Sequence, residues 1–86
     1  MLYTVYVNIL PREEILDPQG KATNRALGHL GYGAIQDVRV GKRIRLQVEA
    51  ASEQAAHDMA GKAAEQLLAN KLTEHYTLEM DHTELA

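Results

Sequence analysis

The order in which the hydrophobic spacing changes along the chain limits the folds that it can adopt. A spacing of two residues indicates a strand, whose side chains point alternately to its two faces, whereas a spacing of about 3.6 indicates a helix. Read in this way, the chain alternates between the two patterns several times. The predicted elements are strand 2–10, helix 18–30, strands 35–40 and 43–49, helix 52–69 and strand 72–80. The predicted order is therefore β-α-β-β-α-β.

Local signals support the starts and ends of the predicted helices. Asp17 followed by Pro18 is typical of a helix start, because aspartate caps free amides and proline lacks the N–H that would have no partner there. Ser52 is the corresponding cap of the second helix, and Gly31 favours a left-handed cap at the end of the first. Gly20 lies in the first turn, where glycine costs about 1 kcal/mol relative to alanine. We therefore expect either the sheet or a partner to pack closely against it.

The two middle strands are predicted to form a hairpin. Gly41-Lys42 connects them, and a two-residue connection with glycine first is typical of a type II′ turn. Two β-α-β halves joined in this way most simply form an α+β, ferredoxin-like domain, with a four-stranded antiparallel sheet and both helices on one face. Residues 1–86 are predicted to be a single domain with a frayed tail from about residue 81.

The predicted fold leaves one face of the sheet without a helix. The alternation assigns to this face Thr4, Tyr6, Arg43, Arg45, Gln47, Glu49, His75 and Thr77. Their long aliphatic stems and the tyrosine ring make the face amphipathic, which suits contact with another subunit. The residues that we expect to mediate self-association are Tyr6, Arg45, Gln47 and His75.

Composition excludes several classes of protein. The chain has no cysteine, so it has neither disulfides nor thiolate metal sites. A net charge of -3 and a pI near 5.7 do not provide the basic field of a nucleic-acid binder. No apolar run reaches the ~20 residues that span a bilayer, and the N-terminus lacks a signal-peptide pattern, so we expect a cytoplasmic protein. Because so short a chain buries only ~60–65% of its surface, a dimer or tetramer is the expected source of further stability.

No catalytic constellation appears in the sequence. The four histidines do not have the spacing of metal ligands: His29, His57, His75 and His82. Glu13, Glu14 and Asp17 form an acidic cluster, but no nucleophile or oxyanion hole accompanies it, so a role at a helix N-terminus is the ordinary interpretation. We therefore expect neither a catalytic residue nor a bound metal on this chain.

Positive charge is concentrated around the predicted hairpin, at Arg39, Lys42, Arg43 and Arg45. Two interpretations stay open. These residues are either solvated charges that protect a sheet edge from strand addition, or a contact for an acidic partner or a phosphate-bearing ligand. A nucleic-acid role is disfavoured, because phenylalanine and tryptophan are absent and few rings are available for stacking.

Three blocks of sequence resemble a known family. The blocks are Leu16–Ala22, Val38–Lys42, and Leu67–Asn70 with the following Glu74 and Tyr76. In this order they resemble the start of the first helix, the hairpin and the closing helix-to-strand passage of the small, PurS-type subunit of phosphoribosylformylglycinamidine synthase. The total length also matches. Lys71 differs from the family pattern, which often has proline at this position.

The resemblance implies a subunit without an active site. In such enzymes a synthetase subunit uses ATP to activate the amide oxygen of formylglycinamide ribonucleotide, and a glutaminase subunit releases ammonia from glutamine. The small subunit self-associates and holds the two together. The resemblance thus implies no cofactor on this chain, with ATP and magnesium on the synthetase subunit. The residues that we expect to contact these partners are Gln19, Gly20, Lys21, Arg39, Gly41 and Lys42.

A regulatory protein is the alternative from another class. A ferredoxin-like domain that binds a small ligand, such as an amino acid or a nucleotide, at a dimer interface would have the same predicted fold. Calorimetry with glutamine, glycine and adenine nucleotides separates the two, because tight binding by the isolated chain would favour the regulatory domain.

Overall fold

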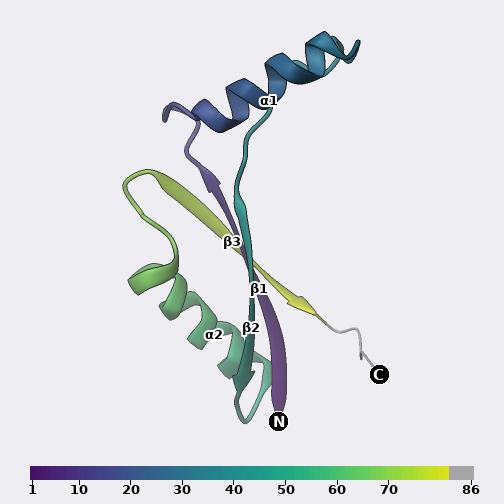
Figure 1. The fold of residues 1–86 in the computed structure, drawn as a ribbon. Helices are drawn as coiled ribbons and strands as arrows, with labels where there is room; N and C mark the ends of the chain where they lie inside the picture. The colour runs from purple at the N-terminus through teal and green to yellow at the C-terminus, as the bar shows by residue number, and fades with distance from the viewer. Residues whose placement is uncertain (82–86) are drawn as a thin grey trace.

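The computed structural model describes residues 1–81 of the chain. Its elements are β1 (Leu2–Pro11), α1 (Pro18–His29), β2 (Lys42–Glu49), α2 (Glu53–Ala63), the short π-helix η1 (Ala64–Leu68) and β3 (Glu74–Asp81) (Figure 1). Apart from Asp81, the tail that the sequence predicts to fray lies outside the described residues.

The three strands form one antiparallel sheet in the order β2-β1-β3. β1 is the central strand, in which Val7 lies opposite Ile44 of β2 and Leu78 of β3. The prediction of a four-stranded sheet is therefore wrong for residues 1–81, because residues 35–40 belong to no strand. The observed order is that of a ferredoxin-like sheet without the edge strand that would lie beside β2.

The chain around Gly41 is extended, and the predicted hairpin does not form. A type II′ turn requires a positive φ at its first central residue, and the φ angle of Gly41 is not positive. Gly41 instead lies against the backbone of β1, where a Cβ atom would meet the carbonyl oxygen of Ile9. Glycine is required here because two segments of the chain approach closely, and not because the chain turns. Both situations favour glycine, so the sequence does not distinguish them. Residues 35–40 consequently lead straight into β2 (Figure 1).

The core lies between one face of the sheet and the second helix. Val5, Val7 and Ile9 of β1 are 0, 0 and 1% exposed. They pack in clusters with the alanines Ala56, Ala60, Ala64 and Ala69. Alanine lets the helix approach the sheet closely, but each residue buries little apolar area. The predicted alternation of β1 is confirmed.

η1 changes which residues of the second helix face the sheet. The N–H of Ala69 donates to the carbonyl oxygen of Ala64 at 3.0 Å, the bond that spans five residues in a π-helix. This wider turn shifts the later positions around the helix axis, so that Leu68 packs against the core. Leu67, which regular helical spacing predicts to be buried, is 82% exposed.

α1 stands clear of the sheet, beyond the end from which β1 leaves, and away from α2 (Figure 1). Within α1, all of which the structure describes, Gly20 is the buried residue, and Leu30 beyond its end is 73% exposed. The prediction that both helices cover one face is therefore wrong. The radius of gyration is 16.3 Å, against roughly 12 Å for a compact chain of this length. We call residues 12–41, which include α1 and both of its connections, the helical arm.

Candidate functional site

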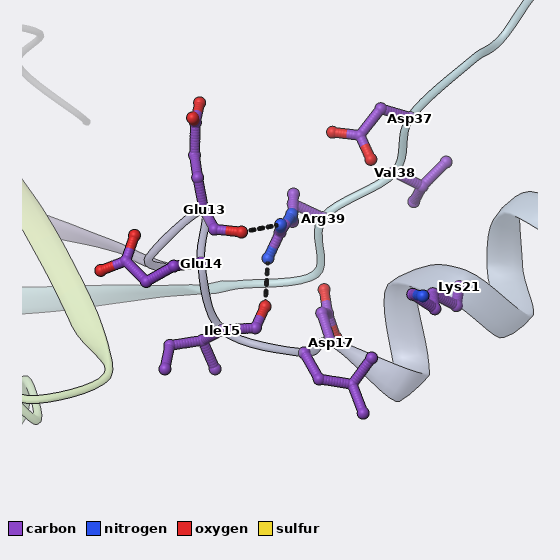
Figure 2. A pocket seen from close by; sticks show the side chains of 9 residues that line it. Glu13, Glu14, Ile15, Asp17, Lys21, Asp37, Val38 and Arg39 are labelled. Carbon is purple, nitrogen blue, oxygen red and sulfur yellow. Dashed lines mark hydrogen bonds between the residues drawn. The ribbon is translucent and has the colours of Figure 1, made fainter.

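The two connections of the helical arm meet at its base. The loop after β1 and the segment before β2 run past the start of α1, and they enclose a shallow hollow of about 300 Å³ (Figure 2). Its lining includes Glu13, Lys21, Asp37 and Arg39. We call this site the basal hollow.

Asp17 connects the start of α1 to the segment before β2. Its Oδ1 accepts a hydrogen bond from the N–H of Gly20 at 3.0 Å, and its Oδ2 accepts one from the N–H of Val40 at 2.9 Å. The bond from Val40, followed by that from Gly20, lowers the pKa of Asp17, and the charge of Arg39 acts in the same direction. The predicted helix cap is confirmed, and the second bond ties both connections of the arm together.

Arg39 holds the loop after β1 in place. Its Nη2 donates to the carbonyl oxygen of Glu13 at 2.7 Å, and its Nη1 donates to that of Ile15 at 2.9 Å (Figure 2). Nη1 also donates to the carbonyl oxygen of Arg12 at 3.3 Å. The planar guanidinium suits this task, because its N–H groups form a rigid fork. Arg12 in turn donates to the carbonyl oxygen of Lys71 through Nε and Nη2, at 3.1 and 2.8 Å. The two arginines thus link the arm to the turn before β3.

Gly20 lies in close contact with the segment before β2. A Cβ atom at this position would meet the carbonyl oxygen of Val38 and the carboxylate of Asp17. The expected close contact at Gly20 is present, but the segment before β2 makes it, and not the sheet or a partner.

The six residues predicted to contact partner subunits all lie at the base of the arm, in different roles. Gln19 and Lys21 are exposed on the first turn of α1. Lys42 forms an ion pair with Glu74 of β3, with 3.6 Å between Nζ and Oε2. The other three, Gly20, Arg39 and Gly41, make contacts within the chain. Contact with a partner stays a prediction for all six, and Lys21 is best placed for it because its charge has no partner in residues 1–81.

Three of the four carboxylates around the basal hollow are unpaired. The side chains of Glu13, Glu14 and Asp37 make no hydrogen bond or ion pair within the described part of the chain. The basic residues nearby behave differently, since Lys42 and Arg43 are paired with glutamates and Arg39 binds carbonyl groups. The rim of the hollow is therefore predominantly negative. The acidic cluster found in the sequence contributes to this charge, and Asp37 adds to it from the segment before β2.

A network of polar side chains crosses the face of the sheet opposite α2, which we call the open face. Arg43 of β2 donates from Nη2 to Oε2 of Glu79 on β3 at 3.0 Å, and from Nη1 to Oδ1 of Asn8 on β1 at 2.9 Å. Its guanidinium carbon lies 3.8 Å from the centre of the Tyr6 ring, a cation–π contact. The hydrogen bond from Arg43 lowers the pKa of Glu79. One arginine therefore joins all three strands.

The residues predicted for the open face do share it. Tyr6 lies opposite Arg45, Thr4 lies opposite Gln47, and His75 pairs with Leu10. The sequence-based assignment omits Asn8 and Glu79, although the same alternation that places Tyr6 there would have found both. Self-association through these residues stays a prediction.

The histidines of the described residues are scattered over the fold. Within residues 1–81, no three histidine, aspartate or glutamate side chains are grouped to hold a metal ion. His29 is the last residue of α1, and Nδ1 of His57 lies 3.9 Å from Oδ1 of Asp58. His82 is outside the described residues. Among the helices described, none has the length and apolar character needed to cross a membrane.

Comparison with known protein families identifies the family of this chain. Residues 4–82 match the family model of PurS, described as phosphoribosylformylglycinamidine (FGAM) synthase. The chain belongs to the PurS family. Membership of the PurS family confirms the sequence-based assignment to an assembly subunit of FGAM synthase in purine biosynthesis.

Curated PurS subunits align with nearly the whole chain. The subunit from Mycobacterium leprae is 44% identical over 72 residues, which cover 84% of this chain and 87% of the relative. The subunit from Bacillus subtilis is 38% identical over 80 residues, which cover 93% and 94%. The similarity therefore includes the sheet, the helical arm and α2.

Solved PurS structures share the fold. The PurS subunit from Thermotoga maritima matches with a TM-score of 0.88 at 30% identity, covering 94% of this chain and 93% of that one. A chain in the structure of PurLQS from the same organism matches with a TM-score of 0.87 at 30% identity, covering 94% and 99%. That second structure contains a PurS chain within an assembly.

Proposed function

We propose that this subunit performs no chemistry itself and joins the synthetase and glutaminase subunits of FGAM synthase, so that ammonia passes between their active sites. The observation that carries the proposal is the helical arm. It projects from the sheet on a base that hydrogen bonds hold in one arrangement, and its helix buries little against its own chain. Such an arm is suited to binding other polypeptides.

The chemistry of the reaction explains why an assembly subunit is needed. Ammonia released into bulk water would be protonated and diluted before it reached the second active site. Holding the two sites together raises the effective concentration of the nucleophile. In this proposal ATP and magnesium bind to the synthetase subunit, the complex is cytoplasmic, and the chain described here supplies contacts alone.

Two surfaces are available for these contacts. The basal hollow, in which Lys21 stands among the unpaired carboxylates of Glu13, Glu14 and Asp37, suits a partner surface of mixed charge with an acidic group opposite Lys21. The open face, with the network centred on Arg43, suits self-association into a dimer or tetramer, because its side chains are already ordered and lose little entropy on binding.

A charge reversal at the basal hollow tests the proposal. Lys21→Glu replaces the unpaired cation of the rim by a carboxylate, which would repel an acidic group of the partner. Lys62→Glu makes the same change on the exposed side of α2 as a matched control. We expect glutamine-dependent formation of FGAM by the reconstituted complex to fall at least about tenfold with Lys21→Glu, equivalent to about 1.4 kcal/mol of binding. Synthesis from added ammonium should be unchanged, because the synthetase site is intact. Equal glutamine-dependent rates for both variants would refute the role of the basal hollow.

A further inference from the structure

Within residues 1–81, every hydrogen bond between the helical arm and the rest of the chain starts at Arg12. Its N–H donates to the carbonyl oxygen of Thr73 at 2.8 Å. Its guanidinium donates to the carbonyl oxygen of Lys71, through Nε at 3.1 Å and Nη2 at 2.8 Å. The bonds of Arg39 and Asp17, in contrast, stay within the arm. Arg12 is therefore the residue through which the arm is fastened to the remainder of the fold.

The bonds of Arg12 give the arm a third point of support. The chain enters the arm after Pro11 of β1 and returns from it at Lys42 of β2, the neighbouring strand. Two covalent connections alone define an axis about which a rigid body can turn. Lys71 lies in the turn that runs from η1, in the layer of the second helix, to β3 (Figure 1). Bonds to this turn act out of the plane of the sheet, so they resist rotation of the arm about that axis.

The carbonyl group of Lys71 is itself held in place. The ammonium group of Lys71 forms an ion pair with Glu65 of η1, with 3.0 Å between Nζ and Oε2, and the hydroxyl of Tyr76 on β3 donates to Oε1 of Glu65 at 2.8 Å. Oδ1 of Asn70 accepts the N–H of Leu72 at 3.1 Å, which closes the turn on either side of Lys71. The carbonyl oxygen is therefore a fixed acceptor, and a rigid guanidinium fork bound to it allows little motion.

Arg12 is equally fixed on the side of the arm. Its carbonyl oxygen accepts the N–H of Ile15 at 3.0 Å and Nη1 of Arg39 at 3.3 Å. Because Arg39 also holds the carbonyl groups of Glu13 and Ile15, the base of the arm and Arg12 form one unit. Rotation of the arm relative to the sheet must therefore break the bonds from Arg12 to the turn before β3.

We propose that Arg12 is a positioning residue for ammonia transfer, because it fixes the direction in which the helical arm leaves the sheet. The inference rests on the proposed function, in which the arm contacts the partner subunits. A partner bound to the arm turns with the arm, whereas contacts of the sheet stay in place. A change of this angle therefore misaligns the two active sites, and a misplacement of about 1 Å can lower a rate about 100-fold.

Two substitutions test the guanidinium of Arg12. Arg12→Met keeps the aliphatic stem and removes every side-chain donor, whereas Arg12→Lys keeps a single donor group. Both variants keep the backbone N–H and with it the bond to Thr73. Arg25→Met is the matched control, because Arg25 is exposed on α1 and its side chain makes no hydrogen bond or ion pair within the described residues.

The ratio of glutamate released to FGAM formed measures the transfer in the complex reconstituted from all three kinds of subunit. A complex that passes on all its ammonia releases the two in equal amounts. We expect Arg12→Met to raise the ratio at least about threefold, because ammonia escapes when the sites are misaligned. Arg12→Lys should raise it less, and Arg25→Met should leave it unchanged. Synthesis from added ammonium should be the same with every variant.

An unchanged ratio with Arg12→Met in a complex from which all the subunits co-purify would overturn the positioning role. If Arg12→Met fails to fold or to co-purify, Arg12→Lys decides in its place, and an unchanged ratio with this variant would likewise overturn the role. A loss of assembly without misalignment lowers the yield of complex but does not change the ratio in the complex that forms.

Amide hydrogen exchange shows whether the arm itself is loosened. We expect the amide of residue 12 to exchange at least about tenfold faster in Arg12→Met, because the loss of two hydrogen bonds favours opening at this point. Amides in the centre of β1 should exchange as in the unsubstituted protein. A raised ratio without faster exchange at residue 12 would also overturn the positioning role, since the arm would then have kept its place.

Omission of this subunit from the reconstitution tests the proposed function separately. If glutamine-dependent synthesis proceeds equally well without the subunit, the proposed function is wrong. If synthesis requires the subunit and Arg12→Met keeps the original ratio, the positioning role of Arg12 alone is wrong.

Discussion

The carboxylate of Asp17 accepts a hydrogen bond from the backbone N–H of Val40, 23 residues further along the chain, at 2.9 Å. The same carboxylate caps α1 through Gly20. One side chain therefore sets both where the first helix begins and how the chain returns from it to the sheet.

Replacing Asp17 should loosen the helical arm without affecting α2. Asparagine can still cap the helix, but its amide group offers one acceptor atom in place of two. We therefore expect Asp17→Asn to keep the bond to Gly20 and to lose the bond from Val40. Amide hydrogen exchange should then be faster at Val40 and unchanged in α2. Ser52→Ala removes the cap that binds the N–H of Ala55. In this variant amide exchange should be faster in α2 and unchanged at Val40.

Two glycines of α1 should respond in opposite ways to alanine. Gly20→Ala places a methyl group against the carbonyl oxygen of Val38, and we expect it to lower the free energy of unfolding by about 1–3 kcal/mol, as overpacking does. A Cβ atom at Gly28 would have no atom within 4 Å. Gly28→Ala should therefore raise the free energy of unfolding by about 0.5–1 kcal/mol, because alanine favours a helix and restricts the unfolded chain. Urea denaturation measures both. Equal effects of the two substitutions would show that Gly20 is not tightly packed.

Arg39 should act through the shape of its guanidinium and not through its charge. Lysine keeps the charge but cannot donate in a fork to three carbonyl groups. We expect Arg39→Lys to expose the loop at residues 12–16 to proteolysis and to reduce glutamine-dependent synthesis. Arg25→Lys serves as the control, because Arg25 is exposed on α1 and its side chain makes no hydrogen bond or ion pair within the described residues. Full activity with Arg39→Lys would mean that its bonds to the loop are dispensable.

Stability should decrease in acid below about pH 4.5. The folded-state pKa values of Asp17 and Glu79 are lowered by hydrogen bonds from Val40 and Arg43, and that of Glu65 by a hydrogen bond from Tyr76. A lowered pKa means that the unfolded chain binds more protons in this range, so each contribution is present above the ordinary values of about 3.9 for aspartate and 4.3 for glutamate. It is lost as the pH falls through the folded-state value.

Urea denaturation between pH 7 and pH 3 measures this dependence. Arg43→Gln removes the cation that lowers the pKa of Glu79, so its loss of stability in acid should be smaller than that of the unsubstituted protein. If the free energy of unfolding of Arg43→Gln fell with pH as steeply as that of the unsubstituted protein, the contribution of the Arg43–Glu79 pair would be contradicted.

The alternating pattern of β1 is enough to predict which face of the sheet is buried, because side chains of a strand point to its two faces in turn. The same reasoning places Tyr6 and Arg45 together on the open face, and the alanine spacing of α2 predicts the helix that covers the core. Leu67 shows the limit of this reasoning. Its helical spacing predicts burial, but the π-turn at Ala64 shifts the face, and no local signal marks where such a turn forms.

By itself, the sequence determined β1, β2, β3 and the two α-helices with their N-terminal caps, and the family, because each of these depends on neighbouring residues or short blocks. The tertiary structure decided the direction of the chain at Gly41, and with it the number of strands in the sheet and the place of α1. It also decided that Arg39 binds the loop after β1 of the same chain. These features depend on which backbone lies across from a residue, and the carbonyl oxygen that Gly41 approaches belongs to Ile9, 32 residues earlier. Glycine serves turns and close approaches equally well, so only the folded chain distinguishes the two.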